Sequence, residues 1–112
     1  MKRYNWTDFK GGWFIGDFSP SMFVTPNVEV CIKRYNAGDY DRSHYHKLAD
    51  EVTMIVDGVV EMNGVQYHKN DILHIERGET TDFRALSDAI TCVVKIPCVK
   101  NDKYLTEQIV LV

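Results

Sequence analysis

Two histidines and one glutamate stand close together in this sequence, and these residue types can bind a metal ion together. His44 and His46 are two residues apart, and Glu51 opens the apolar run 52–56. Residues two apart on a β-strand point to the same side, so both imidazoles would share one face. A turn at 48–50 would bring the next strand back alongside, with Glu51 across from the histidines. Such a ligand set leaves open positions on a divalent metal, and Fe, Mn, Ni and Zn all remain candidates.

The elements that must position these residues are short β-type runs separated by turn residues. Turn chemistry is present at 36–39, at Asp57-Gly58 and at Asn63-Gly64, and Asn-Gly is a strong hairpin signal. Runs that recur about every 8–12 residues with turns between them predict an all-β sandwich or closed barrel. The predicted strands are 28–35, 44–46, 52–56, 59–62, 65–68, 71–75, 80–86 and 89–96. The first of them alternates, with Val28, Val30 and Ile32 on one face and Glu29, Cys31 and Lys33 on the other.

A family resemblance rests on five of these residues. Gly38, His44, His46, Glu51 and Gly58 match the first cupin motif position for position, and the resemblance covers about residues 28–96. Cupins are double-stranded β-helix barrels of jelly-roll character. The resemblance implies that the two histidines and the glutamate are metal ligands on the barrel interior, in a small cupin that acts on small molecules.

The second cupin motif is only partly present. Asn70-Asp71 stands where the family usually has Gly-Asp, and Thr81 stands where it has a fourth, histidine ligand. A one-residue bulge would be needed to turn the neighbouring Asp82 inward. The candidates for a fourth ligand or for the cavity lining are therefore Thr81, Asp82, His74 and Thr53.

Three functions fit these residues. The first is a metal-dependent enzyme, in which the metal acts as a Lewis acid or binds oxygen. The second is a metal-free keto-sugar isomerase, because the run from His44 to Lys47 resembles the His-x-His-Lys of that cupin branch, whose histidines act as acid and base. That branch tends to have Gln where this chain has Glu51. The third is a non-catalytic ligand-binding cupin, suggested by the degenerate second motif.

Composition narrows the partners and the location. The net charge is −3 and the basic residues form no run, which argues against nucleic acid as a partner. No apolar stretch approaches the ~20 residues of a membrane span, and the first residues are polar. Cys31, Cys92 and Cys98 form no close pair, as expected of reduced thiols. These features predict a cytoplasmic protein with a small-molecule ligand and no membrane contact.

The 112 residues fit a single domain, with the cupin core at about 28–96. The preceding and following extensions are expected to pack on the barrel or on a partner. The end of the chain, 104–112, finishes on four apolar residues that are rarely left exposed and could add a strand to a sheet. Together with the resemblance, this end predicts a homodimer.

Overall fold

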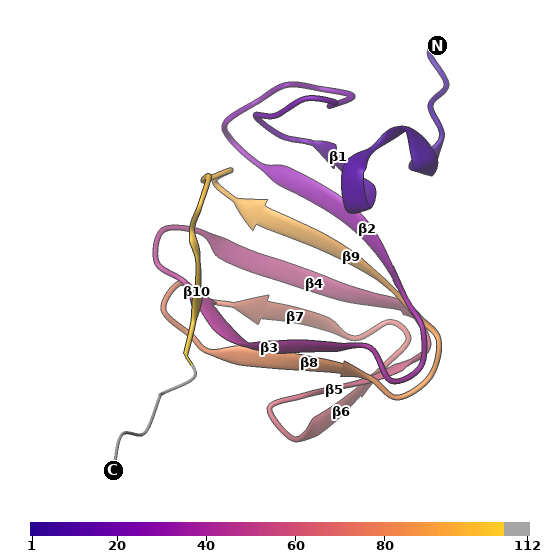
Figure 1. Ribbon diagram of the computed structural model, residues 1–112, viewed down its shortest axis with the longest axis vertical. Coiled ribbons are helices and arrows are strands. Elements are labelled where there is room, and N and C mark those ends of the chain that lie inside the picture. Colours follow the sequence, from indigo (N-terminus) through magenta and orange to yellow (C-terminus); the bar gives the residue numbers. More distant parts are fainter. Residues whose placement is uncertain (107–112) are drawn as a thin grey trace.

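The fold was derived from a computed structural model, which describes residues 1–106 (Figure 1). Two short 3₁₀-helices, η1 (Trp6–Asp8) and η2 (Lys10–Gly12), precede the sheets. The strands of the described part are β1 (Trp13–Ile15), β2 (Glu29–Tyr35), β3 (Tyr40–His46), β4 (Asp50–Asp57), β5 (Val59–Met62), β6 (Val65–His68), β7 (Ile72–Ile75), β8 (Thr81–Ala85), β9 (Ala89–Ile96) and β10 (Lys103–Leu105). Each predicted strand is present, to within a few residues at its ends.

The strands form two five-stranded antiparallel sheets. The first has the order β1-β2-β9-β4-β7 and the second the order β10-β3-β8-β5-β6. Strands distant in sequence are neighbours in both sheets, as Figure 1 shows for β2 with β9 and for β3 with β8. This arrangement confirms the predicted all-β fold class.

The turn residues explain why the hairpins form where the sequence predicts. Asn63 and Gly64 have positive φ angles of 51° and 78° between β5 and β6, as a two-residue hairpin of the primed kind requires. Gly58 also has a positive φ, and a side chain at this position would collide with the backbone oxygen of Asp88. Both turns therefore depend on residues that tolerate a positive φ angle.

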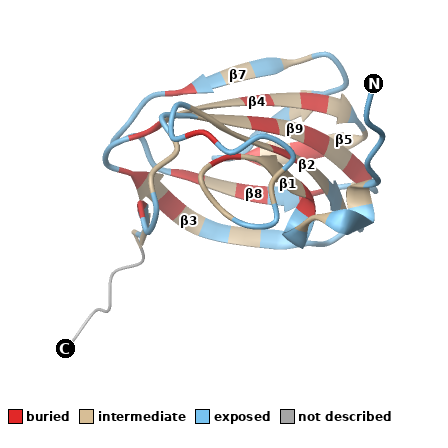
Figure 2. Ribbon diagram, turned by 90° about the horizontal axis from the view of Figure 1, so that it is seen from above, coloured by how far each residue is buried: buried red, intermediate tan, exposed pale blue. Residues whose placement is uncertain are grey.

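The polarity of the side chains between the two sheets changes from one end of the barrel to the other. At one end they meet in an apolar core of Ile55, Val60, Met62, Ile75, Phe83, Ala85 and Ala89. At the other end the buried side chains are polar, among them His44, His46, Thr53 and Thr81. Figure 2 shows the alternation of buried and partly exposed residues along β4 and β9. The polar end holds the candidate site.

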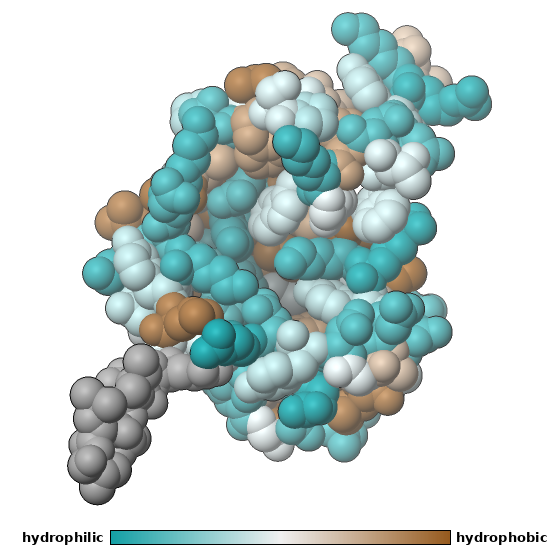
Figure 3. Space-filling model, viewed as in Figure 1, coloured by the Kyte–Doolittle hydropathy of each residue, from teal (hydrophilic) through white to brown (hydrophobic). Residues whose placement is uncertain are grey.

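Strand β2 turns its more polar face inward. Cys31 is fully buried and Lys33 lines a cavity between the sheets, so this face of the strand points into the barrel. Val30 and Ile32, on the opposite face, are only partly buried. This apolar surface continues across the outer face of the first sheet. Val94 and Cys92 of β9 lie opposite Val30 and Ile32, and Val52 and Met54 of β4 lie on the other side of β9. By contrast, the face of the molecule seen in Figure 3 is mostly hydrophilic.

Both extensions add strands to the sheets. β1 pairs with β2, and the indole Nε1 of Trp6 donates a 2.7 Å hydrogen bond to the backbone oxygen of Ile32. β10 pairs with β3, so the start of the apolar C-terminal segment joins the chain's own second sheet. The rest of that segment, 107–112, lies outside the described residues. Within residues 1–106, no helix has the length and apolar character needed to cross a membrane.

Candidate functional site

The two histidines lie side by side at the polar end of the barrel. Both come from β3, and their ring centroids are 5.4 Å apart with the rings nearly perpendicular. His44 is 8% exposed and His46 5%. The predicted pair therefore shares a buried environment, and the rest of the geometry decides what each ring can do.

His44 is fixed by a backbone carbonyl. Its Nδ1 lies 2.7 Å from the backbone oxygen of Arg42. A carbonyl oxygen can only accept a hydrogen bond, so Nδ1 carries the proton. In the neutral ring this leaves Nε2 as a free lone pair, the arrangement by which second-shell contacts orient metal-binding histidines.

His46 has a buried nitrogen without a partner. Its Nε2 is buried and makes no hydrogen bond with the described residues. Burial, together with the nearby charge of Lys95, lowers the pKa of His46 to about 4. The ring is therefore neutral at neutral pH, which is the form that binds a metal. An unpaired buried polar atom costs stability, so this nitrogen is a site where a ligand or ion would be favourable.

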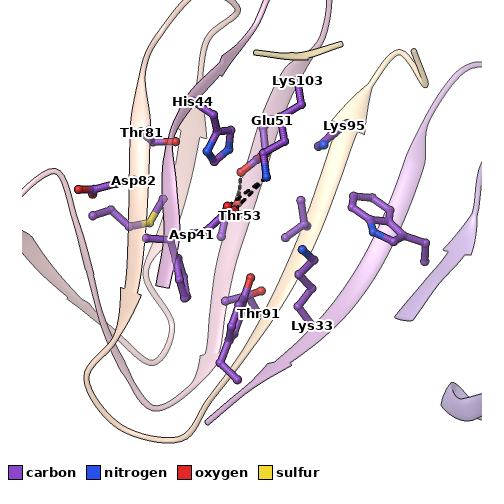
Figure 4. Close-up of a pocket in the computed structure, with 15 residues that line it drawn as sticks. Lys33, Asp41, His44, Glu51, Thr53, Thr81, Asp82, Thr91, Lys95 and Lys103 are labelled. Carbon is purple, nitrogen blue, oxygen red and sulfur yellow. Dashed lines mark hydrogen bonds and ion pairs between the residues drawn. The ribbon is translucent and has the colours of Figure 1, made fainter. Parts of the chain in front are cut away.

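Glu51 is oriented by its neighbour on the same face of β4. The Thr53 hydroxyl donates a 2.8 Å hydrogen bond to Glu51 Oε2, drawn as a dashed line in Figure 4. Thr53, one of the candidates for the cavity lining, is 2% exposed. One carboxylate oxygen is thus occupied, which leaves Oε1 for another partner.

Asp102 anchors the turn between the histidines and Glu51. Its buried carboxylate accepts hydrogen bonds of 3.0–3.2 Å from the backbone N–H groups of Lys47, Leu48 and Ala49. Charged acceptors of several backbone donors make strong hydrogen bonds. The turn expected at 48–50 is therefore held by a residue that lies more than fifty positions later in the chain.

A small cavity opens between the sheets beside these residues. It has a volume of about 60 Å³ and contains His44, Glu51, Thr53 and Thr81 in its wall. Thr81 lies directly opposite His44 on β8 and is 7% exposed. His46 does not line this cavity; it lines an adjoining pocket. Trp13, Lys95 and Lys103 belong to the walls of both.

The other two candidate ligands are engaged elsewhere. Asp82 borders the cavity, but its Oδ1 accepts a 2.7 Å hydrogen bond from the backbone N–H of Asn63. The register of β3 and β8 is irregular here, but the extra residue lies on β3 and not on β8. His74 is exposed on the outside of the barrel, with Nε2 3.0 Å from Asp50. It points outward because it pairs with Val52, which faces away from the Glu51 side of β4. His74 is thus not brought to the cavity.

The donor types fit a divalent metal, although the side chains do not form a closed group. Among residues 1–106, no three His, Cys, Asp or Glu side chains lie close enough together to hold a metal ion. The unpartnered Nε2 of His46, the free Nε2 of His44 and the second oxygen of Glu51 are nevertheless the donors that such a metal prefers.

Sequence reasoning missed the role of Asp102 and of three lysines in the cavity wall. Asp102 gives no local signal, because it acts on a distant turn. In the predicted strand 28–35, Lys33 shares a face with Glu29 and Cys31. The pairing of β2 with β9 shows that this face is the inner one. A polar residue in an otherwise buried strand is the one sequence signal that could have pointed to Lys33.

Comparisons with known proteins identify the fold. No protein-family model matches the sequence, and no curated protein matches it. A double-stranded β-helix protein from Klebsiella pneumoniae has a TM-score of 0.65 at 21% identity, over 75% of this chain and 74% of that one. An RmlC-like cupin from Shewanella frigidimarina has a TM-score of 0.63 at 15% identity, over 69% and 72%. The DMSP lyase DddQ from Ruegeria pomeroyi has a TM-score of 0.69 at 19% identity, over 84% of this chain and 49% of that one. These likenesses show that the chain has the double-stranded β-helix fold of the cupins, as the motif predicted.

Proposed function

We propose that this cupin barrel binds a divalent metal through His44, His46 and Glu51 and acts as an enzyme on a small molecule. The observation that carries the proposal is the buried Nε2 of His46, which has no hydrogen-bond partner among the described residues, next to a histidine whose proton is fixed on Nδ1. Among the similar structures, one is a lyase, so the fold is compatible with catalysis. The metal's identity stays open among Fe, Mn, Ni and Zn.

Each residue of the site has a role that follows from its contacts. The Arg42 carbonyl keeps the proton of His44 on Nδ1, and the Thr53 hydroxyl steadies Glu51. Asp102 fixes the spacing between His46 and Glu51 by holding the turn that joins them. A bound metal would supply Lewis acidity in the open coordination positions. The Thr81 hydroxyl, opposite His44, can donate a hydrogen bond to a substrate oxygen in the cavity.

Elemental analysis of protein purified without an affinity tag or a chelator tests the proposal. We expect about one metal per chain, and its loss in His46→Ala. A substrate screen with the metal-loaded protein would then look for turnover that disappears in Glu51→Gln. Metal-free protein whose melting temperature does not respond to added metal would refute the proposal.

The metal-free isomerase remains the second candidate, because His44 offers a lone pair on Nε2 to the cavity. In this alternative the histidines would transfer protons on a keto-sugar linked to a nucleotide. The low pKa of His46 makes it a poor proton donor near neutral pH. Thermal stabilisation of metal-free protein by nucleotide-sugars would favour this candidate, and none at millimolar ligand would count against it. If neither metal nor turnover is found, a non-catalytic ligand-binding cupin is left.

We further propose that two copies pair through the outer face of the first sheet. This face carries Val30, Ile32, Cys92, Val94, Val52 and Met54, with Ile72 and Ile96 exposed at 63% and 46%. The first six of these residues are only partly buried, and the last two are exposed, so part of this face is open to solvent. A flat apolar sheet packs well on a second such sheet, and a second copy supplies one by symmetry.

Ultracentrifugation tests the pairing. The wild type is expected to sediment as a dimer and Val94→Asp, at the centre of this face, as a folded monomer. The control is Val65→Asp, at an exposed position on the other sheet, which should leave the dimer intact. A monomeric wild type would refute the pairing. The three cysteines, all free, support the proposal of a cytoplasmic location.

A further inference from the structure

Three lysines line the cavity, which is unusual for the interior of a barrel. Lys33 comes from β2, Lys95 from β9 and Lys103 from β10 (Figure 4). A charged group that is partly removed from water is costly unless an opposite charge or hydrogen-bond partners compensate it. The partners of each lysine therefore indicate whether the cavity is complete without a ligand.

Two of the three have such partners. Lys103 Nζ lies 3.0 Å from Asp41 Oδ1, forming an ion pair at the edge of the cavity. Lys95 lies opposite Glu29 on β2 and opposite Glu51 on β4, between the two carboxylates. Its ammonium also stands over the ring of Trp13, 5.1 Å from the centroid. Lys103 is thus ion-paired, whereas Lys95 makes no ion pair or hydrogen bond with residues 1–106 but lies between two carboxylates.

Lys33 is the exception. It is partly buried, makes no ion pair or hydrogen bond with any of residues 1–106, and, unlike Lys95, has no carboxylate opposite it on β9. Other groups lie against the carboxylates of the cavity: Lys103 pairs with Asp41, the Asn63 backbone donates to Asp82, and Lys95 lies opposite Glu51. Its cross-strand neighbour is Thr91, which stands beside it in Figure 4. The wall therefore presents an ammonium group without an anion, close to a hydroxyl.

We infer that Lys33 binds the carboxylate of a small organic acid in the cavity. A carboxylate fits better than a phosphate, because the described residues that line the cavity include no arginine and no helix N-terminus to supply the several donors that a phosphate uses. The volume of about 60 Å³ admits a group of a few atoms, so larger parts of the molecule would extend through the opening. The same wall holds His44 and Glu51, so the inference adds a substrate class to the proposed function and rests on it in that respect.

Binding of acetate to chelator-treated protein tests the inference without any metal. Acetamide has the same shape and no charge, and inorganic phosphate is the competing anion. In titration calorimetry at low salt we expect acetate to bind and acetamide and phosphate to bind at least about tenfold more weakly, because a charge-assisted hydrogen bond is lost or unmatched. Lys33→Met should lose acetate binding by about the same factor, and the exposed Lys69→Met should retain it. Equal binding of acetate and acetamide, tighter binding of phosphate, or acetate binding unchanged in Lys33→Met would overturn the inference.

The melting temperature without ligand gives a second readout. An ammonium kept for a ligand is unpaired in the free protein, so Lys33→Met should raise the melting temperature or leave it unchanged. A lysine with a structural role would lower it on replacement, and that result would also overturn the inference. If acetate binds through Lys33 but no metal binds, the carboxylate site stands and the metal proposal fails. If metal binds but acetate does not, the metal proposal stands and the carboxylate inference fails.

Discussion

The two ends of the barrel interior are built from the same strands but differ in what they contribute to stability and to binding. Strand β4 crosses both: Glu51 and Thr53 lie in the polar end, and Ile55, fully buried, lies in the apolar core. The buried side chains of the core at the apolar end are hydrophobic and provide stability through burial. The polar end contains the Nε2 of His46, which has no hydrogen-bond partner among residues 1–106 and so reduces stability in the absence of a ligand. The difference indicates that one end maintains the fold and the other is kept for binding.

Ile55→Ala should give the largest effect, confined to stability. Removing a fully buried aliphatic side chain creates a cavity and should lower the free energy of unfolding by about 2–5 kcal/mol, measured by urea denaturation. The matched control is Ile72→Ala, 63% exposed, which should change it by less than about 0.5 kcal/mol. Metal affinity of the folded variant should stay near the wild-type value, and a large loss of it would undermine the division between the two ends.

Asp102→Asn should lower both stability and metal affinity. The substitution keeps the shape but removes the charge that accepts hydrogen bonds from three backbone N–H groups, so the free energy of unfolding should fall by about 1–3 kcal/mol. Metal affinity should fall as well, because the released turn joins His46 to Glu51. Asp88→Asn is the control, since this exposed carboxylate holds a single backbone N–H, that of Ala37. Unaltered metal affinity in a destabilised Asp102→Asn would contradict the positioning role.

Thr53→Val should separate binding from stability. It removes the hydroxyl that orients Glu51, so the metal should bind about tenfold more weakly, as is typical for loss of a second-shell partner. The free energy of unfolding should change by no more than about 1 kcal/mol. Thr53→Ser restores the hydroxyl and should restore the affinity, as calorimetric titration would show; a serine variant no better than valine would remove Thr53 from the site.

Asp50→Asn, outside the barrel, should give the smallest effect and a pH-dependent one. Hydrogen bonds from His74 and Arg77 lower the pKa of Asp50 from 3.8 to about 2. A carboxyl group whose pKa is lowered in the folded state stabilises the protein above its unfolded pKa, and this contribution is lost as the pH falls. The stability difference between wild type and variant should thus be constant above about pH 4 and shrink toward pH 2. A difference that stays constant down to pH 2 would show that the carboxylate's charge is not involved.

The sequence predicted the strands well because each hairpin turn has its own local chemistry. Asn63-Gly64 adopts the positive φ angles that its residue types favour, and the two histidines share a face as the two-residue spacing requires. What could not be predicted is which face of a strand points inward. In β2, alternation alone would turn Val30 and Ile32 toward the core, but the sheet directs Cys31 and Lys33 there and leaves the apolar residues outside.

Contacts between strands that are distant in the chain could not be predicted from the sequence either. The position of Thr81 opposite His44 depends on the register between β3 and β8, and that register includes an irregularity between Asp41 and His44. His74 looked like a replacement ligand because it lies in a strand near the second motif, yet its pairing with Val52 turns it outward to Asp50. In both cases the neighbouring strand, rather than the local sequence, decides where the side chain lies.

Calorimetric titration of chelator-treated protein with Zn²⁺ or Mn²⁺ tests the central claim most directly, with wild type, His46→Ala and His74→Ala compared under the same conditions. The account predicts about one binding site per chain in the wild type and in His74→Ala, whose histidine lies outside the cavity, and no site in folded His46→Ala. No binding to the wild type, or equal binding to all three proteins, would contradict the claim that the polar end of the barrel is a metal site.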